Sequence, residues 1–128
     1  MNYLQYNIFY WHHSERTGLA RCRNCSQFSF FLKVNHNGLC DKCVPIIENI
    51  VLSCARIMKE SLNFLNKSED LQTRLTYCNL LFKNALRLEE YEKKGIQTIK
   101  PHPSIFIEEC QKIKKELHHV SLKEERIS

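Results

Sequence analysis

Two pairs of cysteines with the same internal spacing constrain this chain more than any other feature. Two residues separate Cys22 from Cys25 and Cys40 from Cys43, and fourteen residues lie between the pairs. Such a pair can place both thiolates on one metal ion, and a second pair completes a tetrahedron with sulfur about 2.3 Å from zinc. The spacing therefore predicts one zinc ion (Zn2+) bound by all four cysteines. Four thiolates leave no open position for water or substrate, so we expect a structural ion rather than a catalytic one.

Other uses of paired cysteines fit this sequence less well. The chain has seven cysteines, and residues 1–7 resemble no export signal. We therefore expect a cytoplasmic, reducing environment, in which paired cysteines are metal ligands more often than disulfides. A redox C-x-x-C would need a βαβ context. An iron–sulfur cluster also uses four cysteines, but the paired arrangement favours zinc. No segment approaches the roughly 20 apolar residues of a membrane span, so no membrane partner is expected.

A short strand and a turn are expected between the two pairs. Residues 28–34 are rich in aromatic and β-branched side chains, which favour strands. Residues 35–38, Asn-His-Asn-Gly, have the composition of a turn, and together the two segments predict a short β-hairpin. Upstream, the aromatic-rich residues 3–11 are interpreted as a strand or a packed arm.

Helical periodicity begins after the second pair. Apolar residues at spacings of three and four predict helices at about 44–66, 69–94 and 104–119, with residues 122–128 frayed. Pro45 suits a first helical turn, Ser68 is the expected N-cap of the second helix, and Gly95 is expected to end it. Cys54, Cys78 and Cys110 fall on the three apolar stripes and are expected in the core.

The predicted fold is mostly α with a small β-hairpin zinc module joined to three helices. We expect the aromatic arm and the four-cysteine module in residues 1–43, and a three-helix body in residues 44–128. The two parts are expected to form one compact unit.

Residues 20–60 resemble a treble-clef zinc finger of the GATA-like kind. In that family a first cysteine pair forms a knuckle, a hairpin follows, and the second pair lies at the start of a helix. Here Gly38-Leu39-Cys40-Asp41-Lys42-Cys43 runs directly into the helix expected from Val44. Treble clefs bind DNA, RNA or proteins, so the resemblance selects no function. Residues 44–51 are apolar and slightly acidic, whereas phosphate contacts need Lys or Arg. We therefore expect this helix to be buried, with zinc fastening the hairpin to the helical body.

Charge and aromatic content define two candidate binding surfaces. The net charge is +5, which is compatible with an acidic partner. The candidate nucleic-acid or anion-binding patch consists of basic residues near the cysteines: Arg16, Arg21, Arg23, Lys33 and Lys42. The candidate protein interface is the aromatic arm with Tyr6, Phe9, Tyr10 and Trp11, because Tyr and Trp are favoured at hot spots. Packing of the arm on the finger is favoured over that role.

These features predict a non-enzymatic, zinc-stabilised binding module, such as a small regulator, inhibitor or adaptor that binds a protein. A homodimer is compatible with three amphipathic helices. The alternative is a DNA- or RNA-binding zinc finger. A nuclease fragment is a distant alternative, because an HNH-type site needs a histidine in the hairpin and a second on the next helix. His36 fits the first position, but no histidine follows Cys43 on that helix. Of the other histidines, His12, His13, His118 and His119 are expected to be exposed.

Overall fold

Three long helices make up most of the structure, a computed structural model that describes residues 5–6 and 16–127. The helices are α2 (Cys43–Lys67), α3 (Leu71–Lys93) and α4 (Pro103–Ile127). The strands are β1 (Gln5–Tyr6), β2 (Arg16–Arg21), β3 (Phe28–Val34) and β4 (Ile99–Lys100). The prediction of a mostly helical chain with short strands is confirmed.

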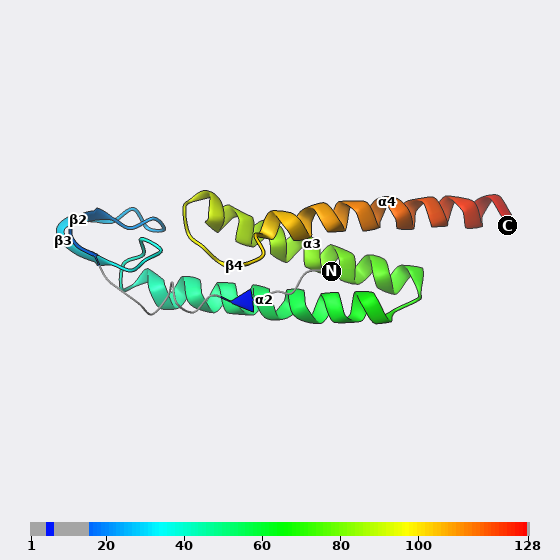
Figure 1. Cartoon of the computed structure of the whole chain (residues 1–128), viewed down its shortest axis with the longest axis horizontal. Coiled ribbons are helices and arrows are strands. Elements are labelled where there is room, and N and C mark those ends of the chain that lie inside the picture. Colours follow the sequence, from blue (N-terminus) through cyan, green and yellow to red (C-terminus); the bar gives the residue numbers. More distant parts are fainter. Residues whose placement is uncertain (1–4, 7–15, 128) are drawn as a thin grey trace.

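The helices run alternately up and down along an elongated molecule. Helix α3 packs against both α2 and α4, and the β2–β3 hairpin lies at one end, beside the start of α2 (Figure 1). At the opposite end, α4 extends past the turn between α2 and α3 (Figure 1). Strand β1 pairs with β4 and also contacts α2. Of the helices that the structure describes, none has an apolar stretch long enough to cross a bilayer.

The turn between α2 and α3 differs from the prediction. Ser68 is the C-cap of α2, and its N–H donates to the carbonyl of Phe64. The N-cap of α3 is Asp70, whose carboxylate accepts hydrogen bonds from Thr73 N at 2.9 Å and Thr73 Oγ1 at 2.8 Å. The prediction of Ser68 as N-cap is therefore wrong, because the aspartate next to Leu71 satisfies an otherwise unpaired N–H of the first turn.

The ends of the last two helices follow proline and glycine. Gly95 lies just past α3 with φ +86°, a left-handed conformation that glycine adopts without strain. Pro103 is the first residue of α4, where its missing N–H costs no hydrogen bond. Helix α4 continues to Ile127, so the prediction of fraying from Leu122 is wrong. The last turns contain no Gly or Pro and are rich in Leu, Lys, Glu and Arg, which favour helix.

The hairpin is formed differently from the one expected. Strand β3 is confirmed, but it pairs antiparallel with β2, which precedes the first cysteine pair, in a register that joins Arg21 to Phe28. The first pair therefore lies in the connection between the two strands. The hairpin predicted between the pairs is reduced to the turn at 35–38 and one bridge from Val34 to Cys40. Strand propensity alone does not predict β2, because it contains Gly and Ala, which are poor strand formers. Its pairing with β3 is what makes it a strand.

The aromatic arm is only partly described. Gln5 and Tyr6 form β1, in antiparallel register with Lys100 and Ile99, so a strand is confirmed for these two residues. Phe9, Tyr10, Trp11, His12 and His13 lie outside the described residues. Strand β4 was not expected.

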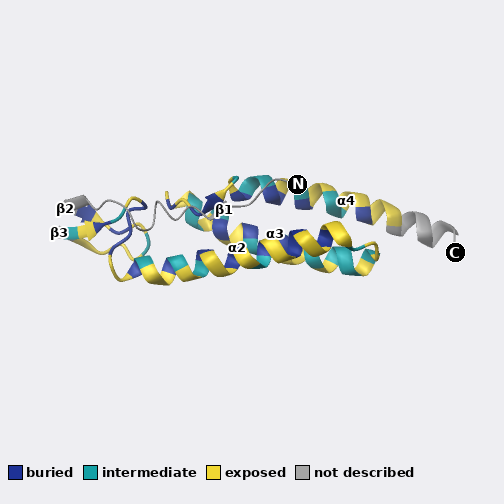
Figure 2. Cartoon of the chain, turned by 60° about the horizontal axis from the view of Figure 1, so that its bottom comes forward, coloured by how far each residue is buried: buried dark blue, intermediate teal, exposed yellow. Residues whose placement is uncertain are grey.

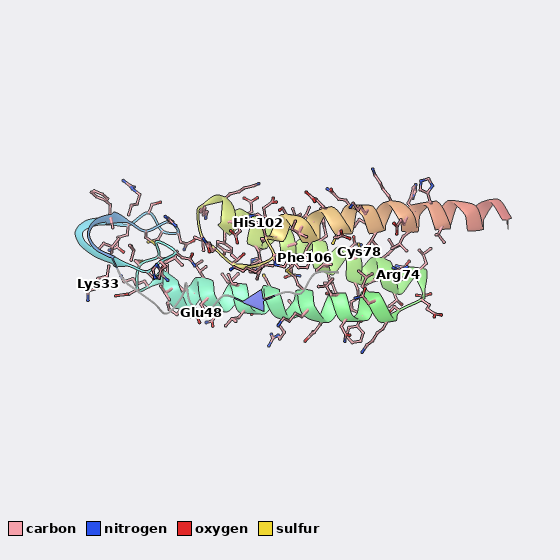
Figure 3. All side chains as sticks on the ribbon, in the orientation of Figure 1. Lys33, Glu48, Arg74, Cys78, His102 and Phe106 are labelled. Atoms are coloured by element: carbon pink, nitrogen blue, oxygen red, sulfur yellow. The ribbon has the colours of Figure 1, made fainter. Side chains whose placement is uncertain are left out.

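One buried cluster extends from the cysteine pairs along the helices. It includes Cys22, Leu39, Cys40 and Cys43 at one end and Phe106 and Cys110 further along. Figure 3 places Phe106 and Cys78 where α3 and α4 face each other. Cys54, Cys78 and Cys110 are buried as predicted. Val120 of α4 is 45% exposed, consistent with α4 extending past its neighbours.

Candidate metal centre

The four predicted cysteines meet in one cluster. The sulfur atoms of Cys22, Cys25, Cys40 and Cys43 all lie within 4.8 Å of one another. Cys22 and Cys25 come from the connection between β2 and β3, Cys40 follows the turn at 35–38, and Cys43 is the first residue of α2. Three of the cysteines are buried, and Cys25 is exposed. The four cysteines are thus arranged to hold a metal ion.

The distances fit a tetrahedral site of four thiolates. A Zn–S distance of about 2.3 Å implies about 3.8 Å between sulfur atoms at the corners of the tetrahedron. Cys25 Sγ and Cys40 Sγ are 3.8 Å apart, and the largest separation in the cluster is within 4.8 Å. A contraction of about 1 Å or less therefore brings every pair to the tetrahedral distance.

Hydrogen-bond donors surround the sulfur atoms. The N–H of Cys40 donates to Cys22 Sγ at 3.3 Å, and Asn24 Nδ2 donates to Cys43 Sγ at 3.4 Å. Such donors around the ligands stabilise thiolates and orient them for the metal. Asn24 was not singled out from the sequence, although its place between Cys22 and Cys25 is a signal for this role.

The thiols of the cluster differ in acidity before a metal binds. Burial raises the pKa of Cys22, but the N–H groups of Cys25, Cys40 and Asn24 outweigh it and lower this pKa to about 6. Burial raises the pKa of Cys43 to about 12, and it also raises the pKa of Cys40. A metal ion binds cysteines as thiolates, so binding at this cluster would release the remaining thiol protons to solvent.

Arg23 joins the metal-binding module to the helical body. Its Nη1 donates to the carbonyl of Gly95 at 2.6 Å and to that of Asn37 at 3.4 Å. Its side chain lies so close to Gly38, which has φ +70°, that an added Cβ there would be 2.6 Å from Arg23 Nε. The guanidinium thus bridges the turn at 35–38 and the connection that follows α3.

Asn37 makes a second connection to the same segment. Its Nδ2 donates to the carbonyl of Gln97 at 3.1 Å, and its Oδ1 accepts from Gln97 N at 2.9 Å. Asn37 is 1% exposed, so its side chain is shielded from water. Figure 1 shows the connection between α3 and β4 beside the module. The sequence alone assigned Asn37 to a turn and gave no sign of a partner 60 residues away.

The structure describes the side chains of three of the four remaining basic residues of the predicted patch. Arg21 is exposed, and its guanidinium carbon lies 5.2 Å from the centre of the exposed Phe28 ring. Lys33 and Lys42 are exposed, and Figure 3 places Lys33 at the hairpin end of the molecule. Arg16 begins β2, and its side chain is outside the described part of the structure. Arg23 is not available to this patch, because its guanidinium donates to the carbonyls of Gly95 and Asn37.

Among the residues that the structure describes, no histidine joins the metal cluster. His36 is exposed in the turn, and His118 and His119 are exposed on α4. His102, at the start of α4 (Figure 3), accepts a hydrogen bond from Ser104 N at its Nδ1 and thereby caps that helix.

No protein-family model matches this chain, and comparison with curated proteins and with solved structures found no match either.

Proposed function

We propose that this chain is a non-enzymatic, zinc-stabilised binding module that acts through contacts with another protein, as a small regulator, inhibitor or adaptor. Zinc is the proposed metal because four thiolates at tetrahedral distances form a closed structural zinc site. Such a site leaves no position for a substrate. A reducing, cytoplasmic setting belongs to this proposal, since the thiolates must remain reduced to bind the ion.

The treble-clef identity is also a proposal. The position of Cys43 as the first residue of α2 supports it, and so does the first pair within a tight connection. The placement of strands on both sides of the first pair departs from the pattern in which the hairpin follows that pair.

The observation that carries protein binding is the distribution of exposed apolar side chains. Among the described residues, six of the seven large apolar side chains that are exposed belong to the helices. They are Ile46, Leu52, Phe64, Leu80, Leu86 and Val120. Figure 2 shows exposed segments along both α2 and α3. Ile46, Phe64 and Leu80 gather along the flank where α2 meets α3, whereas Leu52, Leu86 and Val120 lie apart from them. Exposed apolar surface that gathers in one place is typical of protein interaction sites. The use of Arg23 in internal hydrogen bonds adds support, since it removes a central cation from the candidate nucleic-acid patch.

One observation favours the alternative of nucleic-acid binding. The exposed ring of Phe28 beside Arg21 is a combination that can stack on a base and pair with a phosphate. Residues 16–43 carry five bases and one acid, so the hairpin end is the more positive part of the chain.

Co-purification and salt dependence separate these two functions. The tagged full chain, recovered from its native host after nuclease treatment, is expected to carry one stoichiometric protein partner that is retained at about 200 mM salt. Binding of a labelled single-stranded oligonucleotide is expected to be absent at about 50 mM salt. Oligonucleotide binding that falls steeply with salt and is lost in Arg21→Glu, but not in Arg56→Glu, would reverse the choice. Sedimentation of the purified chain tests the homodimer.

A further inference from the structure

Helix α2 carries a second apolar row beside the one that packs in the core. The row consists of Ile46, Ile50, Ile57 and Phe64, which lie within about 40° of one another around a helix of 3.6 residues per turn. Ile46 is 56% exposed and Phe64 is 45% exposed, whereas Ile50 and Ile57 are half-buried. This row therefore borders the solvent along about 27 Å of the helix.

Helix α3 supplies the facing side of the same seam. The rings of Phe64 and Tyr77 are stacked with centroids 5.0 Å apart and an interplanar angle of 16°. Leu80 follows Tyr77 by about one turn and is 39% exposed, and the half-buried Tyr91 lies on the same flank of α3. We call the surface formed by Ile46, Ile50, Ile57, Phe64, Tyr77, Leu80 and Tyr91 the α2–α3 seam.

Helix α4 packs on the other flank of α3, so within the described part of the chain the third helix does not cover the seam. Cys78 Sγ donates to the carbonyl of Cys110, and Lys114 Nζ lies 4.2 Å from the centre of the Phe82 ring. Phe82 and Leu80 are about 160° apart around α3. The third helix therefore does not cover the exposed side chains of Phe64 and Leu80.

Positive charge borders the α2–α3 seam. Four exposed bases lie on its two margins, Arg56 and Lys67 on α2 and Arg87 and Lys94 on α3. Lys94 Nζ lies 5.7 Å from the centre of the Tyr91 ring. Among the described residues on the same margins, Lys83 is a further exposed base, and Glu60 and Glu90 are exposed acids, so the margins keep a net positive charge. The seam is thus an apolar strip between two basic edges.

We propose that the α2–α3 seam is the docking site for an amphipathic helix of a partner protein, with an apolar face and acidic residues on both sides of it. This inference rests on the proposed function as a protein-binding module. The seam length of about 27 Å matches about 18 residues of helix. Apolar side chains of the partner fill the strip, as in other helix-in-groove complexes, and its carboxylates meet the basic margins. A second copy of this chain would bring the same positive margins against them, so charge repulsion disfavours self-association through the seam.

The test uses two synthetic peptides and the zinc-loaded full chain. Both peptides are helical 18-residue sequences, about the length of the seam, with leucine along one face. One has glutamate beside that face, and the other has lysine. In amide NMR spectra, the glutamate peptide is expected to shift resonances of α2 and α3 along the seam, and the lysine peptide is expected to bind at least about tenfold more weakly.

A pair of matched variants locates the site. Leu80→Glu is expected to weaken binding of the glutamate peptide at least about tenfold. Leu86→Glu, at 38% exposure against 39% for Leu80, lies about 120° away around α3 and is expected to bind like the unmodified chain. Both positions are exposed, so the folded helices are expected to persist, as checked by circular dichroism.

Three results would overturn the docking site. The first is that the glutamate peptide does not bind at about millimolar concentration. The second is that its NMR shifts are confined to the hairpin end, and the third is that the chain forms a dimer that Leu80→Glu dissociates. A protein partner from the native host that binds Leu80→Glu normally refutes the seam alone. Recovery of nucleic acid in place of any protein refutes the proposed function itself.

Discussion

Replacement of Arg23 by alanine tests how the metal-binding module is attached to the helices. Arg23 lies between Cys22 and Cys25, two of the cysteines arranged to hold a metal ion, and its guanidinium donates to the carbonyl of Gly95 just past α3. We expect Arg23→Ala to destabilise the folded chain without releasing the metal, because the variant keeps all four cysteines.

The magnitude follows from the two hydrogen bonds. A bond from a charged donor contributes about 1.5–3 kcal/mol when its carbonyl would otherwise be unpaired. The bond to Gly95 is short at 2.6 Å, but Arg23 is exposed, so water can replace part of it. The bond to Asn37, at 3.4 Å, is longer than usual and contributes little. Loss of the aliphatic stem over Gly38 adds to the cost. We therefore expect a loss of about 1–2 kcal/mol, or roughly 3–10 °C in Tm for a chain of this size.

Thermal unfolding of the zinc-loaded protein, followed by circular dichroism, measures this loss. Metal content is measured on the same samples, so that loss of the ion is not mistaken for loss of the hydrogen bonds. Arg56→Ala, which removes an exposed arginine from α2, is the control and is expected to change Tm little. Arg23→Lys should retain part of the stability, because its ammonium can still reach one carbonyl. A Tm for Arg23→Ala within about 1 °C of the control would show that the attachment contributes nothing.

Three further substitutions or treatments test the metal centre, a helix cap and the core. Elemental analysis should find one zinc per chain in the unmodified protein and little zinc in Cys40→Ser. Cys40→Ser should also lose structure at the start of α2. A Cys40→Ser protein that lacks metal but is as stable as the unmodified protein contradicts the site. Asp70→Ala should lower Tm at neutral pH, and Asp70→Ser should retain most of it, because serine is also a good N-cap. Hydrogen bonds from Thr73 lower the pKa of Asp70, so its contribution is present above the unfolded value of about 3.9 and is lost as pH falls through the folded value. The Tm difference between Asp70→Ala and the unmodified chain should therefore shrink in acid, and a constant difference argues against the cap. Burial raises the pKa of Cys110 to about 12, so iodoacetamide at about pH 8 should modify it only after denaturation; labelling of the folded chain at the rate of a free thiol would place Cys110 outside the core.

Features that depend on neighbouring residues were predictable from the sequence. The spacing of Cys22, Cys25, Cys40 and Cys43 predicted a cluster that the structure assembles, because two-residue spacing forces each pair to one side of a tight connection. Helical periodicity placed all three helices, and the predicted core stripe of α2 is buried apart from the half-buried Ile50. These signals are local, and each helix reports its buried face through its own spacing.

Tertiary structure alone decided which residues meet across the chain. The sequence placed Arg23 in a candidate anion-binding patch, whereas packing commits its guanidinium to Gly95, which is 72 residues away. Strands β1, β2 and β4 exist through their pairing, since segments of two to six residues with weak propensity carry no reliable pattern of their own. The apolar row from Ile46 to Phe64 could have belonged to a wide buried face, and only the placement of α4 on the opposite flank of α3 left it open. Local spacing therefore determined the ligands and the helices, and long-range packing determined which of their surfaces remain available for binding.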